Sequence, residues 1–164
     1  SMAETAIVKT RRNHALEHAT VALMLDRGVR PLLGGYSVPG GFFLWSRMPK
    51  EGVTAVVEDA LELLNQGHHD LAISPYCGTN MAVGVLFGGL AASIVRGRGR
   101  GLMANLRGAA AAIVVAALLN QPLGELLQRK FTTKADATGM NIGTVRELLV
   151  KPVNLVWVPV RFDG

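Results

Sequence analysis

The chain has one cysteine, few aromatic residues and few charges for its length of 164 residues. A single cysteine excludes a disulfide within the chain, which is compatible with the cytoplasm. Aromatic residues make up only 5% of the sequence. None of them lies among its clustered arginines, so the stacking surface of a nucleic-acid-binding protein is missing. We therefore expect no nucleic-acid partner.

Charged residues are also scarce, at 18% of the chain, against ~25% in ordinary soluble domains. Hydrophobic residues reach 49%, and the mean hydropathy is +0.30. These values favour a membrane-associated protein or an unusually apolar core. The leading Ser-Met resembles a cloning remnant and takes no part in the fold prediction, and no cleaved signal peptide is expected. The length predicts a single domain over residues 1–164.

Hydrophobic periodicity predicts an α+β fold. Residues 4–27 and 50–66 have apolar positions at helical spacing, and each segment is followed by a glycine suited to end a helix. Residues 42–45 form an aromatic run typical of a strand, and 71–73 predict a second short strand. The expected first part, residues 3–78, is an N-terminal helix packed on a small βαβ-type layer.

Residues 79–130 form the second expected part, a hydrophobic helical hairpin. Residues 81–95 contain no charge, and 108–119 are almost wholly aliphatic. Fifteen helical residues cover only about 22 Å of a ~30 Å hydrocarbon core, so the spans are marginal. The second span is long enough only if residues 120–122 join it. Gly84 and Gly88 would allow close approach to a surface of small residues at Ala112 and Ala116.

A Gly-rich connection between the two apolar segments contains Arg96, Arg98 and Arg100, with Arg107 close behind. Its position favours contact with lipid headgroups, although a solvated loop is the plain alternative. We expect membrane lipid as a partner and a location at the cell membrane, with the cytoplasm as the alternative. The Gly84/Gly88 face offers a surface for a homo-oligomer.

The third expected part, residues 131–164, is a β-rich tail. Residues 141–150 are compatible with a strand or a short helix. Residues 155–162 alternate as a strand does, and Pro159 predicts that this strand lies at the edge of its sheet.

The main chemical signal is His14-Ala-Leu-Glu17-His18. Histidines four apart share one face of a helix, and Glu17 joins that face. Two imidazoles and a carboxylate are what a zinc ion and a water-activating base require. The pattern predicts His14 and His18 as metal ligands and Glu17 as the base.

The other two histidines, His68 and His69, follow the second helix, and Cys77 precedes the hairpin. If the β layer packs on the first helix, His68, His69, Cys77 or an acidic residue would complete the metal site. A cysteine just before a helix has a stabilised thiolate, so Cys77 is also a candidate nucleophile with a histidine as base.

Each of these residues has a structural alternative. For His14 and His18, the alternative is a role as polar groups at the edge of a packed helix. His68 and His69 suit the negative end of a helix dipole. Cys77 is compatible with an inert buried thiol beside a helix capped by Thr79 or Asn80.

Several motifs together resemble an uncharacterised bacterial domain family, and the resemblance implies membrane association. They are the Asn13-to-Ala19 stretch, the Gly40-Gly-Phe segment, Cys77-Gly-Thr-Asn80, Gln121-Pro-Leu-Gly124 and Thr132-Thr133. The resemblance covers about residues 12–161. It implies a prokaryotic, membrane-associated protein and no established activity.

His-x-x-Glu-His alone also resembles the inverted zincins. Those peptidases take a third ligand from a downstream glutamate, whereas this chain has no acid between Asp70 and Glu125. The sequence therefore predicts a membrane-associated zinc-binding protein, with a metal-dependent hydrolase as the more specific hypothesis. The alternatives are a metal-free structural or oligomeric membrane protein and, ranked lower, a Cys-His thiol hydrolase.

Overall fold

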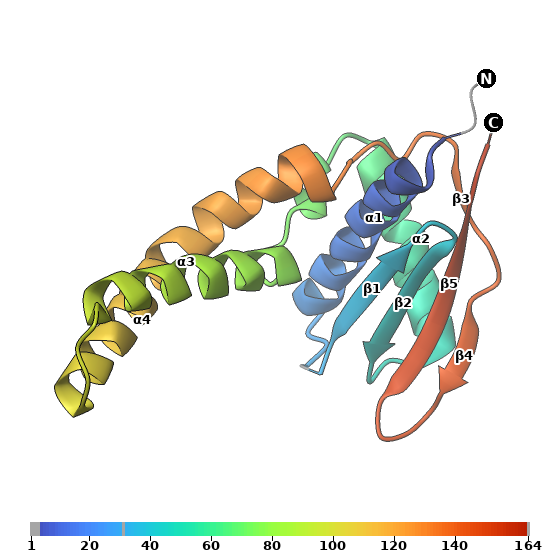
Figure 1. Cartoon of the computed structure of the whole chain (residues 1–164). Coiled ribbons are helices and arrows are strands. Elements are labelled where there is room, and N and C mark those ends of the chain that lie inside the picture. The colour runs from blue at the N-terminus through green and yellow to red at the C-terminus, as the bar shows by residue number, and fades with distance from the viewer. Residues whose placement is uncertain (1–3, 31, 164) are drawn as a thin grey trace. The chain divides into compact units, whose positions relative to one another are not determined.

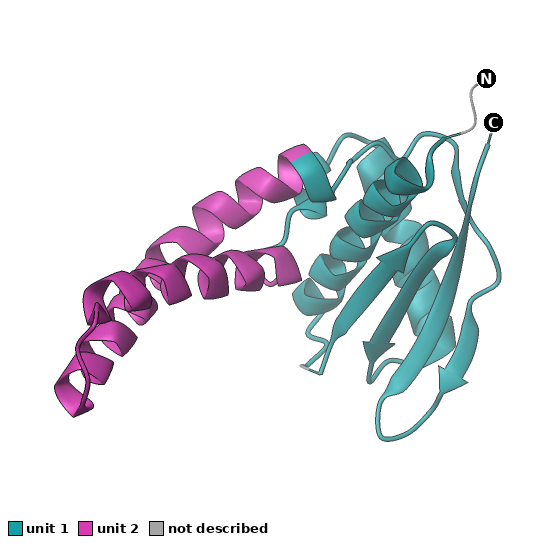
Figure 2. Ribbon diagram, in the orientation of Figure 1, with its two compact units in different colours: residues 1–74, 131–164 teal, residues 75–130 magenta. Residues whose placement is uncertain are grey.

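The computed structural model describes residues 4–30 and 32–163, which form two compact units. Unit 1 contains residues 1–74 and 131–164, and unit 2 contains residues 75–130 (Figure 2). The first and third expected parts of the chain thus belong to one unit, and the hydrophobic hairpin is the other. The predicted α+β class is confirmed.

Unit 1 opens with helix α1, Ala6–Asp26, as its periodicity predicts (Figure 1). The Thr5 hydroxyl caps it by accepting from the Val8 N–H at 3.3 Å. The helix ends before Gly28, whose φ of +80° lies in the left-handed region that favours glycine. The Val29 N–H then returns to the Met24 carbonyl at 2.9 Å, which closes the last turn.

The sheet of unit 1 contains β1 (Gly34–Val38), β2 (Gly41–Ser46), β3 (Met140–Ile142), β4 (Arg146–Leu149) and β5 (Asn154–Phe162). The strand order is β1-β2-β5-β3, and β4 also pairs with β5. Every pairing is antiparallel. The expected βαβ-type layer is therefore an antiparallel sheet instead, because the segment after α2 does not return as a parallel strand.

Helices α1 and α2 (Lys50–Asn65) cover one face of this sheet (Figure 1). The alternating residues Phe42, Leu44, Val156 and Val158 are fully or almost fully buried under them. From the helices, the core takes apolar side chains that recur every three to four residues: Leu16, Ala19, Val53, Val56, Val57, Ala60 and Leu64. Unit 1 therefore has two layers, the sheet and the pair of helices α1 and α2.

Two local predictions are wrong. Residues 71–73 are not a strand, because a 3₁₀ helix, η1 (His69–Ala72), occupies the segment. Strand β5, which contains Pro159, is central rather than at an edge. The proline is tolerated because it lies between the stretch paired with β4, ending at Trp157, and the stretch paired with β3, starting at Val160. No partner there needs an N–H, and the Pro159 carbonyl accepts from Gly143 at 2.8 Å.

Unit 2 is the predicted helical hairpin, with α3 at Gly78–Arg96 and α4 at Leu102–Leu127. At ~1.5 Å per residue these helices are about 28 and 39 Å long, so both exceed the marginal spans expected from sequence. Helix α4 continues through Pro122, which lacks an N–H, and a π-helical turn, η2 (Gln128–Thr132), follows it.

The hairpin packs through small residues, as predicted. A Cβ added at Gly84 would lie 3.5 Å from the Asn120 Cβ and 3.6 Å from the Ala116 Cβ. One added at Gly88 would lie 2.9 Å from the Ala112 carbonyl oxygen. The Gly84/Gly88 face therefore serves packing within one chain. A homo-oligomer through the same face would require the hairpin to open, and it stays a prediction.

We predict that Gly88→Leu destabilises the hairpin by about 1–3 kcal/mol, because its side chain would meet backbone rather than a movable group. Gly89→Leu is the matched control, since nothing lies within 4 Å of a Cβ added there. Reversible unfolding in mixed detergent micelles measures both variants. Equal loss of stability in the two would contradict the packing described.

Candidate metal site

Helix α1 buries an unusual number of polar side chains. Arg12, Asn13, Glu17, His18 and Thr20 are each at most 6% exposed. Buried polar groups must find hydrogen-bond partners, because water cannot reach them. Thr20 donates to the Leu16 carbonyl within the helix. The other four have partners in β1, in η1 or in residues 136–138, so this polar side of α1 determines where those segments lie.

Both imidazoles of the His-x-x-Glu-His motif are held by backbone carbonyls. The His14 Nδ1 lies 2.9 Å from the Thr132 carbonyl oxygen, and the His18 Nδ1 lies 2.8 Å from the Ala72 carbonyl oxygen. A carbonyl oxygen can only accept, so each Nδ1 must be the protonated donor. In the neutral ring the lone pair is then on Nε2, so Nε2 is the atom of each ring that can accept a proton or a metal ion.

The two rings lie next to each other, as the spacing of four predicts. Their centroids are 4.2 Å apart with planes tilted by 58°. One ring nitrogen of each lies within 4.8 Å of the other. Two nitrogens on a tetrahedral zinc are about 3.3 Å apart, so a small side-chain rotation would bring the pair to one ion. The arrangement fits two ligands of a metal.

Glu17 lies against strand β1. Its Oε2 accepts from the Ser37 hydroxyl at 2.5 Å. A Cβ added at Gly35 would lie 2.7 Å from the Glu17 carboxyl carbon, so only glycine allows this approach. The carboxylate is thus fixed by β1, from a residue three positions after His14 and directly before His18, and its role as base stays a prediction.

Two buried polar atoms near these residues have no hydrogen-bond partner within the part of the chain that is described. They are the Thr132 Oγ1, in the residue whose carbonyl holds His14, and the Asn13 Oδ1. Such atoms are rare in folded proteins and commonly mark a place for water or an ion. An apolar pocket of about 430 Å³ adjoins His14, with Ile7, Pro39 and Phe131 among its lining residues. The surroundings of His14 are therefore apolar apart from a few fixed polar atoms.

The structure does not bring His68 or His69 to this pair. Both are exposed, at the start of η1, and neither belongs to the group of possible ligand atoms found around His14 and His18 among the described residues. Cys77 is buried and is itself the N-cap of α3, where its Sγ accepts from the Thr79 N–H at 3.4 Å. The cap expected from Thr79 or Asn80 is thus supplied by the thiol.

Several residues that shape the site were not found from the sequence. Ala72 and Thr132 act through backbone carbonyls, which every residue has, so no sequence signal marks them. Ser37 holds Glu17 from a strand twenty residues away. Of these residues, only Gly35 could have been recognised from the sequence, because a glycine inside a strand commonly marks the close approach of another group.

The comparisons with known proteins give a family but no activity. Residues 9–145 match the model of a domain of unknown function, DUF6391. The chain belongs to the DUF6391 family. An uncharacterized protein of Picosynechococcus sp. is 32% identical over 133 residues, which are 75% of this chain and 65% of the relative. No solved structure matches.

The expectation of an uncharacterised family is therefore confirmed. The DUF6391 match contains His14, Glu17, His18, Cys77 and the whole hairpin, and it ends before the central strand β5. The chain spans about 65% of the length of the curated relative it matches.

Residues 133–138 pack on the N-terminal half of α1. The Lys134 N–H donates to the Arg11 carbonyl at 3.0 Å, and the Arg12 Nε donates to the Asp136 carbonyl at 2.7 Å. Partial burial raises the pKa of the Asp136 carboxyl. Hydrogen bonds from the Thr138 backbone and hydroxyl, with the charges of Arg12 and Lys134, outweigh that effect and lower this pKa below its usual value.

This shift gives the stability of the protein a pH dependence. Because the folded pKa of Asp136 is below the unfolded one, the carboxylate stabilises the fold above about pH 3.9, and this contribution is lost as the pH falls further. We predict that, as the pH falls below about 3.9, the free energy of unfolding decreases less steeply in Asp136→Asn than in the wild type. Urea unfolding at a series of pH values measures it, and an unchanged slope would show that Asp136 makes no such contribution.

Proposed function

We propose that this DUF6391 protein binds a divalent transition metal, zinc first, through the Nε2 atoms of His14 and His18. The observation that supports the proposal is the pair of bonds from each Nδ1 to a backbone carbonyl. Metal-binding histidines regularly donate their other N–H to such a carbonyl, which fixes the tautomer and the ring orientation. Two adjacent histidines with the same fixed tautomer are hard to explain by helix packing alone.

Cys77 is our candidate for the third ligand, on grounds of chain connection and chemistry. The Ala72 carbonyl lies at His18, and Cys77 follows only five residues later. A thiolate with two imidazoles is a donor set that zinc favours. Zinc held in this way would act as a Lewis acid.

We predict stoichiometric zinc in protein purified without chelator, and its loss in His14→Ala and in His18→Ala. Glu17→Gln should keep the metal, because the Glu17 carboxylate is bonded to Ser37 and is not a proposed ligand. The exposed pair His68→Ala/His69→Ala is the matched control and should also keep it. Elemental analysis measures zinc, and circular dichroism checks that each variant is folded.

Cobalt substitution tests Cys77 separately. A thiolate ligand gives cobalt(II) a charge-transfer band in the near ultraviolet, and Cys77→Ser should remove it while weakening metal binding at least about tenfold. A folded wild-type protein without metal, or full zinc in the histidine variants, would refute the site. A cobalt spectrum unchanged in Cys77→Ser would refute only the third ligand.

We also propose that unit 2 is embedded in a membrane. The segments 78–96 and 102–132 are long and apolar enough to cross one. Within the most apolar window of each, only 22% and 6% of residues are buried inside the protein. A core helix of a soluble protein is mostly buried, whereas here large apolar side chains such as Val85, Ile94 and Ile113 are at least 70% exposed. Lipid is the medium that would cover them.

We predict that the protein stays in the membrane fraction after an alkaline carbonate wash and is released by detergent. Val85→Arg/Ile113→Arg should shift it toward the soluble or degraded fraction, because each charge costs about 2.5–3.5 kcal/mol at the centre of a spanning helix. Val85→Ile is the control. Recovery of the wild-type protein in the soluble fraction would contradict membrane insertion.

Metal-dependent hydrolysis is a second candidate function. It is favoured by the buried Glu17, which belongs to the same helical turn as the histidines, and by the apolar pocket beside His14. In this proposal Glu17 takes a proton on a carboxylate oxygen, Ser37 orients that carboxylate, and the pocket holds an apolar part of the substrate.

A further inference from the structure

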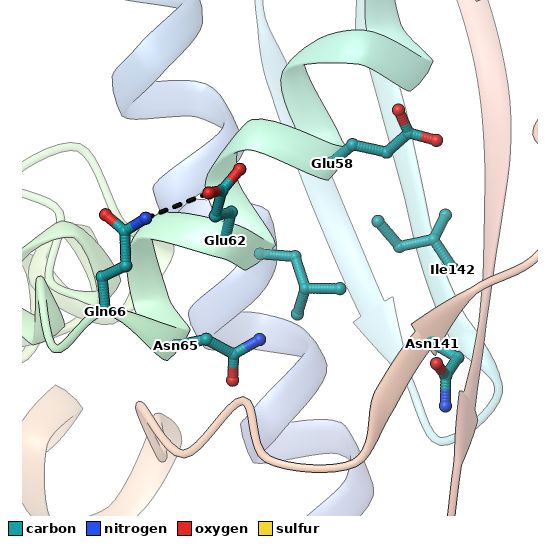
Figure 3. A pocket seen from close by; sticks show the side chains of 7 residues that line it. Glu58, Glu62, Asn65, Gln66, Asn141 and Ile142 are labelled. Carbon is teal, nitrogen blue, oxygen red and sulfur yellow. Dashed lines mark hydrogen bonds between the residues drawn. The ribbon is translucent and has the colours of Figure 1, made fainter.

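A groove runs along helix α2 on the side of strand β3, within unit 1. Its first part is a cavity of about 510 Å³ (Figure 3), lined by Glu58, Leu61, Glu62, Asn65, Gln66, Asn141 and Ile142. Its second part, of about 710 Å³, shares Glu58, Asn141 and Ile142 with the first and extends to Lys50 and Thr144. Because the two parts share three residues, they form one continuous groove.

Strand β3 forms one wall of the groove and is an edge of the sheet. It pairs with β5 on one side, and no described strand lies on its other side. Asp163 N–H donates to the Gly139 carbonyl and Gly143 N–H to the Pro159 carbonyl, each at 2.8 Å. Backbone groups of alternate residues point to the same side of an antiparallel strand. The N–H and C=O of Ile142 therefore point away from β5, toward the outer edge.

The charge of the first cavity is opposite to that of the chain. The chain has a formal net charge of +5, yet the charged residues that line the first cavity, within the described part of the chain, are Glu58 and Glu62. The second part has charges of both signs, from Lys50, Glu51 and Arg161. Glu58 and Glu62 are exposed and lie on the C-terminal half of α2 (Figure 3). The C-terminal end of a helix adds partial negative charge. Glu62 also accepts from the Gln66 amide at 3.0 Å, which orients its carboxylate.

We propose that this groove binds an extended peptide segment of another protein, one that carries lysine or arginine. The segment would pair with the outer edge of β3 through Ile142 and place its basic side chains at Glu58 and Glu62. Strand addition next to a helix is a recurring mode of peptide recognition, in which backbone bonds supply affinity and side-chain contacts supply specificity. A helix of 16 residues is about 24 Å long, and about seven extended residues span it.

A seven-residue peptide of alternating lysine and valine, labelled with fluorescein, is the probe. We expect saturable binding to the full chain in a neutral detergent, measured by fluorescence anisotropy. The same peptide with glutamate in place of lysine should bind at least about tenfold more weakly. Glu58→Lys/Glu62→Lys should reverse this preference. Glu147→Lys, a similar charge change at an exposed position on β4, should not.

The edge contact has its own pair of variants. Ile142→Pro removes the outward N–H together with the side chain but leaves the bonds to β5, because the neighbouring residues make them, and proline is tolerated at an outward edge position. Ile142→Ala removes the side chain and keeps the N–H. We expect loss of binding in the proline variant alone. No saturable binding to the wild type, equal affinity after the Glu58/Glu62 reversal, or equal affinity of the proline and alanine variants would overturn the proposal.

Discussion

The structure of unit 1 depends on the need to satisfy the polar groups that α1 buries. Arg12 shows how this works: it pairs with Glu4 at 2.7 Å, donates to the backbone of Asp136 and Thr138, and stacks at 5.0 Å on the Phe162 ring. Asn13 donates to the Val38 carbonyl at 2.7 Å, and Glu17 accepts from Ser37. Each such bond ties a distant segment to α1, since leaving a buried polar group unpaired costs about 1–3 kcal/mol. The helix therefore organises the chain through polar contacts on one side and apolar contacts on the other.

Local patterns were enough to predict the helices and the strands with clear alternation. Helices α1 and α2 and strand β2 follow from apolar spacing and from glycines at their ends, all of which act over a few residues. The pairing of β5 with β2 could not be predicted, because it joins residues more than a hundred positions apart. The prediction of an edge strand from Pro159 was wrong for a similar reason. The missing N–H of proline favours an edge position, and only the three-dimensional position of Gly143 shows that a central strand can accommodate it. The segment 71–73 has the composition of a strand, but it is too short for composition to decide.

In the candidate site, too, some features could be predicted from the sequence and others could not. The adjacency of His14 and His18 follows from the pitch of a helix, and the close approach of β1 to Glu17 has a signal in Gly35. The tautomer of the two imidazoles, on which the proposed metal binding depends, is determined by the carbonyls of Ala72 and Thr132. A carbonyl has no sequence signature, so this decisive feature is visible only in the structure. His68 and His69 were equally plausible by residue type, and only their exposed position separates them from the pair.

The two carbonyls that bond the histidines also lie close in sequence to the two ends of the hairpin. Ala72 lies three residues before unit 2 begins, and Thr132 lies two residues after it ends. Each imidazole of the pair is thus bonded to one of the two segments through which unit 1 continues into the hairpin. When Nε2 of an imidazole is bound to a cation, its Nδ1–H becomes a stronger donor, and the bond to the carbonyl strengthens. Metal binding at His14 and His18 would therefore strengthen the hydrogen bonds to both the Ala72 and the Thr132 carbonyl. A metal at this position would thus have a structural effect even without catalysis.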